Sequence, residues 1–217
     1  MITHQVDFKK HWNDMYSKGG TNALGLFEEN PAPSLRLIEK CHLPHNALIL
    51  HAGAGASTLI DSLLDKGYQN QIATDISEVA LENLKTILGK VKSGQIQWVI
   101  DDLTHPVKLL NITPVDLWHD RATLHFIQEE REQKTYFDLV RILVKKDGYV
   151  IIAAFNLEGA DKCSGLPVFK YNKKMLSERL GDTFQPLDFF NYTYTMPSGE
   201  QREYIYTLFR KTAHYSR

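Results

Sequence analysis

The sequence predicts an α/β fold in which helices cover both faces of a mostly parallel sheet. The first observation behind this prediction is an apolar run at 47–51 that breaks into Gly53 and Gly55 before an amphipathic helical pattern. The second is that short apolar runs and amphipathic helical segments then alternate along the chain, as in strand–helix–strand units. The third is the end of the chain, where two strand-like segments replace the next expected helix.

The expected elements follow one another in a regular order, after a helical pattern at 6–41. Strands are expected at 47–51, 71–75, 95–100, 115–119 and 148–155, and helices at 57–66, 77–88, 129–145 and 172–180. The segments 184–194 and 203–210 are expected to form an antiparallel hairpin, because a turn-like Met-Pro-Ser-Gly sequence lies between them. The chain is therefore expected to form one compact domain, with a helical segment at 1–45 and the sheet within 46–217.

The composition is that of an ordinary globular protein. Of the 217 residues, 43% are apolar and 24% are charged, and the net charge is −1. This balance offers no basic surface for nucleic acid or an anionic membrane, and no apolar run has the length of a membrane span. The N-terminus lacks the apolar core of a signal sequence, and Cys41 and Cys163 have no metal-binding spacing. We therefore expect a cytoplasmic protein without a metal site.

The strand, glycine turn and helix at 47–66 form an arrangement that brings backbone N–H groups close to a ligand. A second apolar strand ends at Asp75, roughly 20 residues after the glycines, where a carboxylate is placed to bind the hydroxyl groups of a ribose. Together these features predict an adenosine-containing cofactor. Two other interpretations stay open: a helix-capping turn without a ligand, and an N-cap role for Asp75.

Five short motifs occur along the chain in a fixed order. The first motif is the segment 11–16, which holds His11, Trp12 and Tyr16. The other four are the segments 51–58, 75–77, 118–122 and 163–168. In residue type and order they resemble motifs of the class I S-adenosylmethionine (SAM)-dependent methyltransferases, in particular a group of bacterial members. The resemblance covers nearly the whole chain. It implies a Rossmann-like, seven-stranded methyltransferase fold with an antiparallel last strand, SAM as the cofactor and methyl transfer as the reaction.

The resemblance implies a role for the residues that follow the first two strands. Gly53 and Gly55 would allow the backbone to approach the methionine part of SAM. Asp75 would accept hydrogen bonds from both ribose hydroxyl groups, and Ile76 would pack on the adenine. These roles make the two strand ends the adenosine side of the predicted site.

The resemblance also implies contacts from the third strand and from the N-terminal helix. Asp102 would receive the adenine amino group, with Leu103 beside it, although Asp101 is near enough in sequence to take that role. Trp12 and Tyr16 lie one helical turn apart and would fold over the cofactor, as part of a lid formed by 1–45. Plain core packing of this aromatic pair is the alternative.

His51 departs from the resembling enzymes, most of which carry an acid two residues before the first glycine. In those enzymes the acid stabilises the loop and, commonly through a water molecule, meets the methionyl ammonium of SAM. A neutral imidazole at His51 still accepts one hydrogen bond, whereas an imidazolium repels the ammonium and the sulfonium. The sequence therefore predicts SAM binding that weakens as the pH falls through the titration of His51, either in an active enzyme or in a relative that has lost tight binding.

The fourth predicted strand carries the candidates for substrate handling. His119 and Asp120 lie at its carboxyl end, where open α/β sheets bind ligands, and His125 follows shortly after. We take these three as candidate catalytic residues, and His119 also as a cofactor contact. The alternatives are an ion pair between Asp120 and Arg121 and histidines satisfied within the core. The three candidates lack the ligand spacing of a metal site.

The predicted function is methyl transfer from SAM to a small-molecule acceptor. A protein-lysine acceptor is the alternative, because the segment 120–124 is similar to an Asp-Lys-Gly-Thr-Leu run in some lysine methyltransferases of this fold. A non-catalytic binding module is a further alternative because of His51. A nicotinamide oxidoreductase is disfavoured by Thr58, where a third glycine is expected. The Asn-Pro-Pro-Tyr motif of base methylation is absent from the sequence, which argues against a nucleic-acid acceptor.

Overall fold

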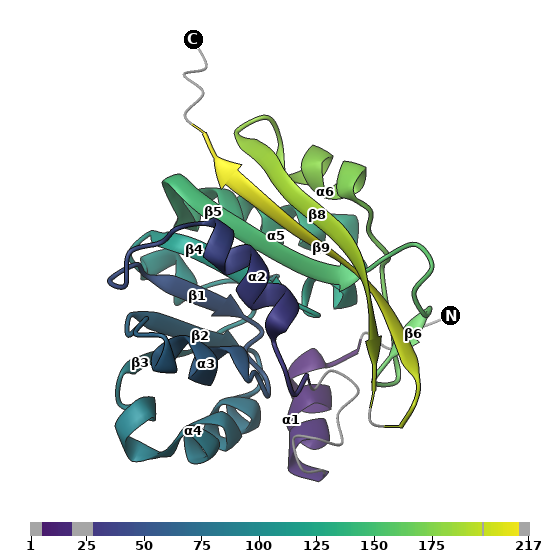
Figure 1. Cartoon of the computed structure of the whole chain (residues 1–217). Coiled ribbons are helices and arrows are strands. Elements are labelled where there is room, and N and C mark those ends of the chain that lie inside the picture. The colour runs from purple at the N-terminus through teal and green to yellow at the C-terminus, as the bar shows by residue number, and fades with distance from the viewer. Residues whose placement is uncertain (1–5, 19–27, 197, 213–217) are drawn as a thin grey trace.

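A seven-stranded sheet forms the centre of the molecule (Figure 1). The computed structural model describes residues 6–18, 28–196 and 198–212. The strand order is β3-β2-β1-β4-β5-β9-β8. β9 runs antiparallel to β5 and to β8, and the other pairs of the sheet are parallel. The predicted fold class, with its antiparallel last strand, is confirmed.

The strands lie close to their predicted positions. In chain order they are β1 Ile49–Ala52, β2 Gln71–Asp75, β3 Ile96–Ile100, β4 Val115–Arg121, β5 Val144–Phe155, β8 Phe184–Thr195 and β9 Gln201–Lys211. The small strands β6 Lys162–Cys163 and β7 Leu166–Pro167 form a separate hairpin that the sequence does not predict. β5 begins directly where the preceding helix ends, so the predicted helix at 129–145 is too long at its end.

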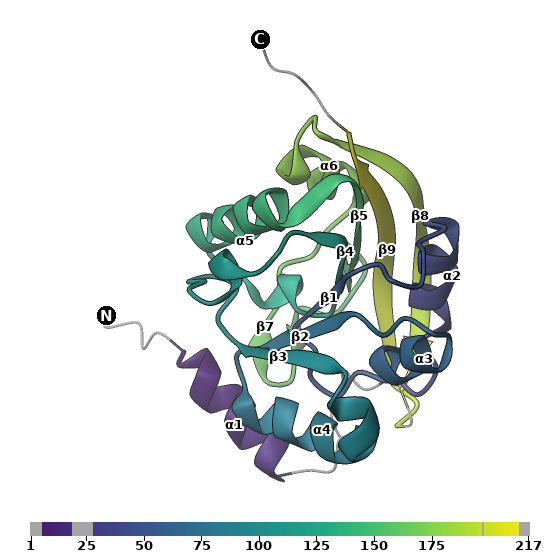
Figure 2. The ribbon, with the colours of Figure 1, turned by 90° about the vertical axis from the view of Figure 1, so that its left-hand side faces the viewer.

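Helices cover both faces of the sheet (Figure 2). They are α1 Phe8–Lys18, α2 Ala32–Lys40, α3 Leu59–Asp65, α4 Glu78–Ser93, α5 Glu130–Leu143 and α6 Lys173–Leu180, with two 3-10 turns, η2 Leu109–Asn111 and η3 Leu124–Phe126. α5 and α6 pack on one face, against inward side chains of β1, β4 and β5. α2 and α3 pack on the opposite face, and α4 packs with α3 on β2 and β3.

The two N-terminal helices have different surroundings. Leu37 and Ile38 of α2 are buried in the core beside Ile49 and Leu117 of the sheet. α1 instead lies against α4, where the Ser77 hydroxyl donates to a side chain of α1. Within the N-terminal segment, α1 therefore packs on α4, while α2 belongs to the core. The division into a lid at 1–45 and a domain at 46–217 stays a prediction.

The strand order places one topological switch point in the sheet, between β1 and β4. β1 connects through α3 to β2 on one side, whereas β4 and β5 lie on the other side. Ligands of open α/β sheets bind in the crevice that such a switch point leaves at the carboxyl ends of the strands. Among the described residues, no helix combines the length and the apolar character needed to cross a bilayer.

Candidate functional site

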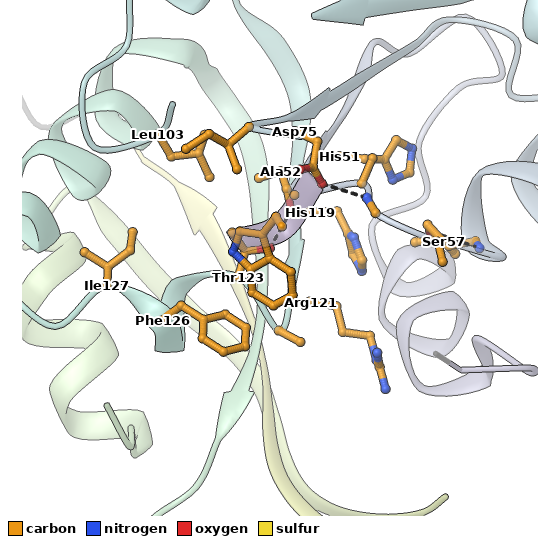
Figure 3. Close-up of a pocket in the computed structure, with 18 of the residues that line it drawn as sticks. His51, Ala52, Ser57, Asp75, Leu103, His119, Arg121, Thr123, Phe126 and Ile127 are labelled. Carbon is orange, nitrogen blue, oxygen red and sulfur yellow. Dashed lines mark hydrogen bonds between the residues drawn. The ribbon is translucent and has the colours of Figure 1, made fainter. Parts of the chain in front are cut away.

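A cavity opens at the carboxyl ends of β1, β2 and β4, and α1 forms part of its wall (Figure 3). The residues predicted to contact the cofactor all line this cavity: Trp12, Tyr16, His51, Gly53, Gly55, Asp75, Ile76, Asp102, Leu103 and His119. They come from five separate stretches of the chain. The fold therefore brings together the residues that the sequence singled out for the cofactor.

The glycine turn after β1 requires its glycines. Gly53 and Gly55 have φ angles of +65° and +46°, a region that residues with a side chain rarely adopt. A Cβ atom on Gly53 would overlap the hydroxyl of Thr123, and one on Gly55 would overlap the hydroxyl of Tyr16. Ala54 between them is not among the residues with positive φ, so alanine is accommodated there. The turn is thus shaped by the close approach of Thr123, just after β4, and of Tyr16 on α1 to its backbone.

Asp75 ends β2 with its carboxylate fixed from two sides. One oxygen accepts the backbone N–H of Gly55 at 2.9 Å and the other accepts that of Ser77 at 2.8 Å. Burial raises the pKa of Asp75 to about 6, and these hydrogen bonds oppose that rise. An ionised carboxylate has about four lone-pair sites, so these contacts do not use up its capacity to accept from a ligand. The N-cap of α4 is Ser77, whose hydroxyl accepts from Ala80, so the capping alternative for Asp75 is wrong.

The two aspartates after β3 differ in how their oxygens are used. Asp101 accepts backbone N–H groups with both oxygens, including those of Val107 and Leu109, and so holds the loop that follows. Asp102 uses Oδ1 for the backbone and hydroxyl of Thr104, at 2.8 and 2.7 Å. Its Oδ2 lies 3.5 Å from Nδ1 of the exposed His105. Asp102 therefore keeps more capacity for a ligand than Asp101 does.

His51 is buried beside the glycine turn and is hydrogen-bonded on one side. Its Nε2 lies 2.7 Å from Oε1 of Gln71, a residue that the sequence analysis did not single out. Burial lowers the pKa of His51 to about 4, and the hydrogen bond to Gln71 opposes this shift only in part. The imidazole is therefore neutral at physiological pH. Burial thus moves the titration of His51, through which the sequence predicts weaker SAM binding, below its ordinary pH range.

A second group of side chains lies along β4 on the far side of β1 from Asp75. We call Glu28, Ser34, His119 and Arg121, which all line the cavity, the β4 cluster. Nε2 of His119 lies 2.9 Å from the Ser34 hydroxyl, and burial lowers the pKa of His119 well below its ordinary value. Arg121 Nε lies 3.0 Å from Glu28 Oε2 and donates to the hydroxyl of Tyr206 at 3.0 Å. In Figure 3 the side chains of His51, His119 and Arg121 follow one another along the same wall.

Asp120 and His125, two of the three candidate catalytic residues, lie outside the cavity wall. The Asp120 carboxylate is fully buried and accepts the hydroxyl of Tyr136 at 2.6 Å and the N–H of Thr123 at 3.0 Å. Nδ1 of His125 accepts the N–H of Phe155 at 3.3 Å, and its ring is buried. Alternation along β4 explains this placement, because His119 and Arg121 face the cavity while Asp120 faces the opposite core. The predicted ion pair of Arg121 is with Glu28 and not with Asp120.

α1 contributes aromatic side chains to the wall. Trp12 packs edge-on against Phe126 with ring centroids 4.9 Å apart, and the Tyr16 hydroxyl reaches the glycine turn. Asn83 of α4 donates to the carbonyl of Tyr16 at 3.0 Å, which fixes this end of the helix. Both aromatic residues are at least nine-tenths buried. Trp12 and Tyr16 therefore both pack in the core and line the cavity.

Other reactive groups do not form a second centre. No group of His, Cys, Asp and Glu side chains within the described ranges is arranged to hold a metal ion. Cys41 and Cys163 are buried thiols, and burial raises the pKa of both. The chemistry of the described part of the chain is therefore concentrated in the cavity at the switch point.

Solved structures of SAM-dependent methyltransferases share the fold of this chain. No protein-family model matches the chain. A mouse EEF1A lysine methyltransferase 2 is 24% identical over 165 residues, which are 70% of this chain and 67% of that protein. A SAM-dependent methyltransferase structure from Anabaena variabilis has a TM-score of 0.74 at 14% identity, covering 94% of this chain and 93% of that one. The 1,6-didemethyltoxoflavin N1-methyltransferase of Burkholderia thailandensis, with 1,6-didemethyltoxoflavin and S-adenosylhomocysteine (SAH) bound, has a TM-score of 0.65 at 20% identity, covering 94% and 84%.

Proposed function

Because the chain has the fold of the class I SAM-dependent methyltransferases, we propose that it transfers a methyl group from SAM to a small-molecule acceptor. The observation that carries this proposal is Asp75. It is a buried carboxylate at the tip of β2, held by two backbone donors and facing a cavity beside a glycine turn. Its remaining lone pairs match the two hydroxyl groups of a ribose.

The adenosine part of SAM is proposed to lie over β2 and β3. Asp75 would accept both ribose hydroxyls, and Ile76 and Leu103 would contact the adenine from the cavity wall. The adenine amino group would donate to Asp102, because the oxygens of Asp101 are already used by the loop. This arrangement leaves the methionine part to cross β1 at the glycine turn and to reach β4.

The acceptor is proposed to bind at the β4 cluster, under the aromatic side chains of α1. Bound SAM would supply a methyl group on a sulfonium, from which the neutral thioether SAH is a good leaving group without further activation. The task of the protein is then to align the acceptor with that methyl group and to exclude water. Trp12 and Phe126 give this end apolar walls, while Ser34 fixes the imidazole of His119.

A small acceptor that brings its own lone pair fits the β4 cluster better than a lysine side chain. A lysine enters as an ammonium and needs a carboxylate partner and a base. Glu28 is the carboxylate of the cluster, and it is already paired with Arg121 and accepts the hydroxyl of Tyr206 at 3.2 Å. Burial keeps His119 neutral and weakens it as a base. A thiolate or an unprotonated heteroaromatic nitrogen needs neither group.

The relatives differ in acceptor, and their names alone do not decide between them. The mouse relative is a lysine methyltransferase, whereas the Burkholderia neighbour acts on a small heteroaromatic molecule. A small-molecule acceptor is favoured here because the Glu28 carboxylate of the β4 cluster already has partners within the protein. The lysine acceptor is the second candidate, and the mouse relative is consistent with it.

The test is transfer of a labelled methyl group from SAM to matched acceptors at neutral pH. We expect transfer to 4-nitrothiophenol, an aromatic thiolate, above the rate without protein, and little transfer to a lysine-containing peptide. Faster transfer to the peptide would select the lysine alternative. SAH binding without transfer to either acceptor would favour the non-catalytic module, and Asp75→Asn provides the matched control with a weakened cofactor site.

A further inference from the structure

The side-chain amide of Gln71 contacts one ring nitrogen of His51 and is itself oriented by two backbone carbonyls. The side-chain amide of Gln71 is fully buried at the start of β2. Its Nε2 donates to the carbonyl oxygens of Tyr68 at 2.8 Å and Ile60 at 3.3 Å. Carbonyl oxygens only accept hydrogen bonds, so the amide nitrogen must face them and Oε1 must face His51. The contact of 2.7 Å between Oε1 and His51 Nε2 therefore requires a proton on Nε2.

The second ring nitrogen of His51 is left as an acceptor. A neutral imidazole with a proton on Nε2 has a bare lone pair on Nδ1. Within the described residues, Nδ1 of His51 is buried and has no hydrogen-bond partner. His51 lines the cavity directly before the glycine turn, at the same sheet register as His119. A buried acceptor without a partner destabilises the unliganded protein, and a donor on a ligand removes that cost.

We propose that Gln71 is a positioning residue that holds His51 as the Nε2–H tautomer, so that Nδ1 accepts a hydrogen bond from the ammonium group of the cofactor. This inference rests on the proposed function, because it assigns one contact within the SAM site. Of the groups that SAM carries, the methionyl ammonium is the cationic N–H donor, and a hydrogen bond from a charged donor is stronger than a neutral one. The pair of His51 and Gln71 thus binds a cation with an uncharged acceptor.

The role of Gln71 follows from what its replacement would do to the ring. Methionine at 71 has a similar length but removes the acceptor for Nε2–H. Nothing then favours one tautomer of His51, and the Nδ1–H form cannot accept the ammonium. Gln97→Met is the matched control, because Gln97 lies on the neighbouring strand β3 and its side chain is exposed.

The direct test is the ¹⁵N spectrum of the His51 ring, identified by its loss in His51→Phe. We expect a protonated Nε2 and an unprotonated Nδ1 in the free protein. SAH should shift the Nδ1 signal, while an SAH analogue without the amino group should bind and leave that signal in place. A protonated Nδ1 in the free protein, or an Nδ1 signal that SAH does not move, would overturn the proposal. The spectrum of the free protein tests the tautomer even where SAH does not bind, and only that failure to bind counts against the proposed function.

Calorimetry of the same two ligands separates Gln71 from a merely structural residue. Wild type and Gln97→Met should bind SAH at least about tenfold more tightly than the analogue without the amino group, as expected for a hydrogen bond from a charged donor. In His51→Phe and Gln71→Met this ratio should fall towards one. Analogue binding by both variants would show that the site remains folded. A ratio in Gln71→Met equal to that of wild type would refute the positioning role.

Discussion

The two ends of the cavity hold their charged groups in opposite ways. At the β2 end, Asp75 is fixed by backbone N–H groups and keeps lone pairs for a ligand. In the β4 cluster, Glu28 and Arg121 are held by each other and by Tyr206. A carboxylate held by the backbone can still accept from a ligand, whereas one paired with a buried cation has its charge compensated. We therefore propose that the first end binds hydroxyl groups, whereas the second shapes a pocket without offering a net charge.

Among the variants that test the two cavity ends, Gly53→Ala is expected to have the largest effect on SAH affinity and stability. The new Cβ atom overlaps Thr123 and sits at positive φ, so the turn must move. We expect the free energy of unfolding to fall by about 2–4 kcal/mol and SAH affinity to fall at least about 100-fold. Thermal unfolding and calorimetry measure the two effects. Gly165→Ala, at positive φ with open space around it, should cost only about 1 kcal/mol of stability and leave SAH affinity unchanged.

Asp75→Asn probes the β2 end alone. The amide keeps the shape of the side chain, but its NH2 group cannot accept the backbone N–H that the replaced oxygen binds. It also turns the charge-assisted hydrogen bonds to the ribose into neutral ones or loses them. We expect SAH binding to weaken by about 2–3 kcal/mol, which is roughly 30- to 150-fold in affinity. An unchanged dissociation constant in calorimetry would mean that the ribose lies elsewhere. Glu28→Gln, at the other end, should lower stability more than SAH affinity, because it removes one charge of the buried Glu28–Arg121 ion pair.

The pH dependence of SAH binding should report Asp75 and not His51. Burial raises the pKa of Asp75 to about 6, and only the ionised carboxylate accepts from both ribose hydroxyls. Affinity should therefore be constant above pH 7 and fall below pH 6, by up to about tenfold per pH unit. The pKa of His51, about 4, places its titration below this range. The same profile in His51→Phe would support this assignment, and a flat profile in that variant would return the titration to His51.

The smallest expected change in SAH affinity is the one that distinguishes Asp101 from Asp102 after β3. Asp102→Asn removes a charged acceptor for the adenine amino group, and SAH affinity should fall by about 3- to 10-fold. Asp101→Asn disturbs a loop held by Val107 and Leu109, so it should lower the free energy of unfolding by about 1–2 kcal/mol with little change in affinity. Calorimetry and thermal unfolding of both variants check this pair. The reverse pattern would assign the adenine to Asp101.

The order of elements was predictable because periodicity and glycine breaks are local signals. β2, for instance, lies at its predicted residues, since an apolar run bounded by polar residues specifies a strand on its own. The boundary between α5 and β5 was not predictable in the same way. Leu143 ends the helix and Val144 begins the strand without a loop, and the pairing of Val144 with Val115 decides that change.

The site was predictable where residues follow directly on strand ends, and not where distant side chains pair. Asp75 and His119 line the cavity as expected, because the carboxyl ends of parallel strands meet at one edge. Gln71, Ser34 and Glu28 gave no signal beyond their residue type, since their partners are brought to them only by the fold. The position of Gln71, a polar residue at the start of an apolar strand, was the one further sign that the sequence offered.

The most direct test of the proposed cofactor position is a crystal structure of the protein with SAH. We expect the carboxylate of Asp75 within hydrogen-bond distance of both ribose hydroxyls, and the homocysteine part passing the glycine turn towards His119. SAH bound away from the carboxyl end of β2, or a ribose that faces no carboxylate, would contradict the assignment of the two cavity ends.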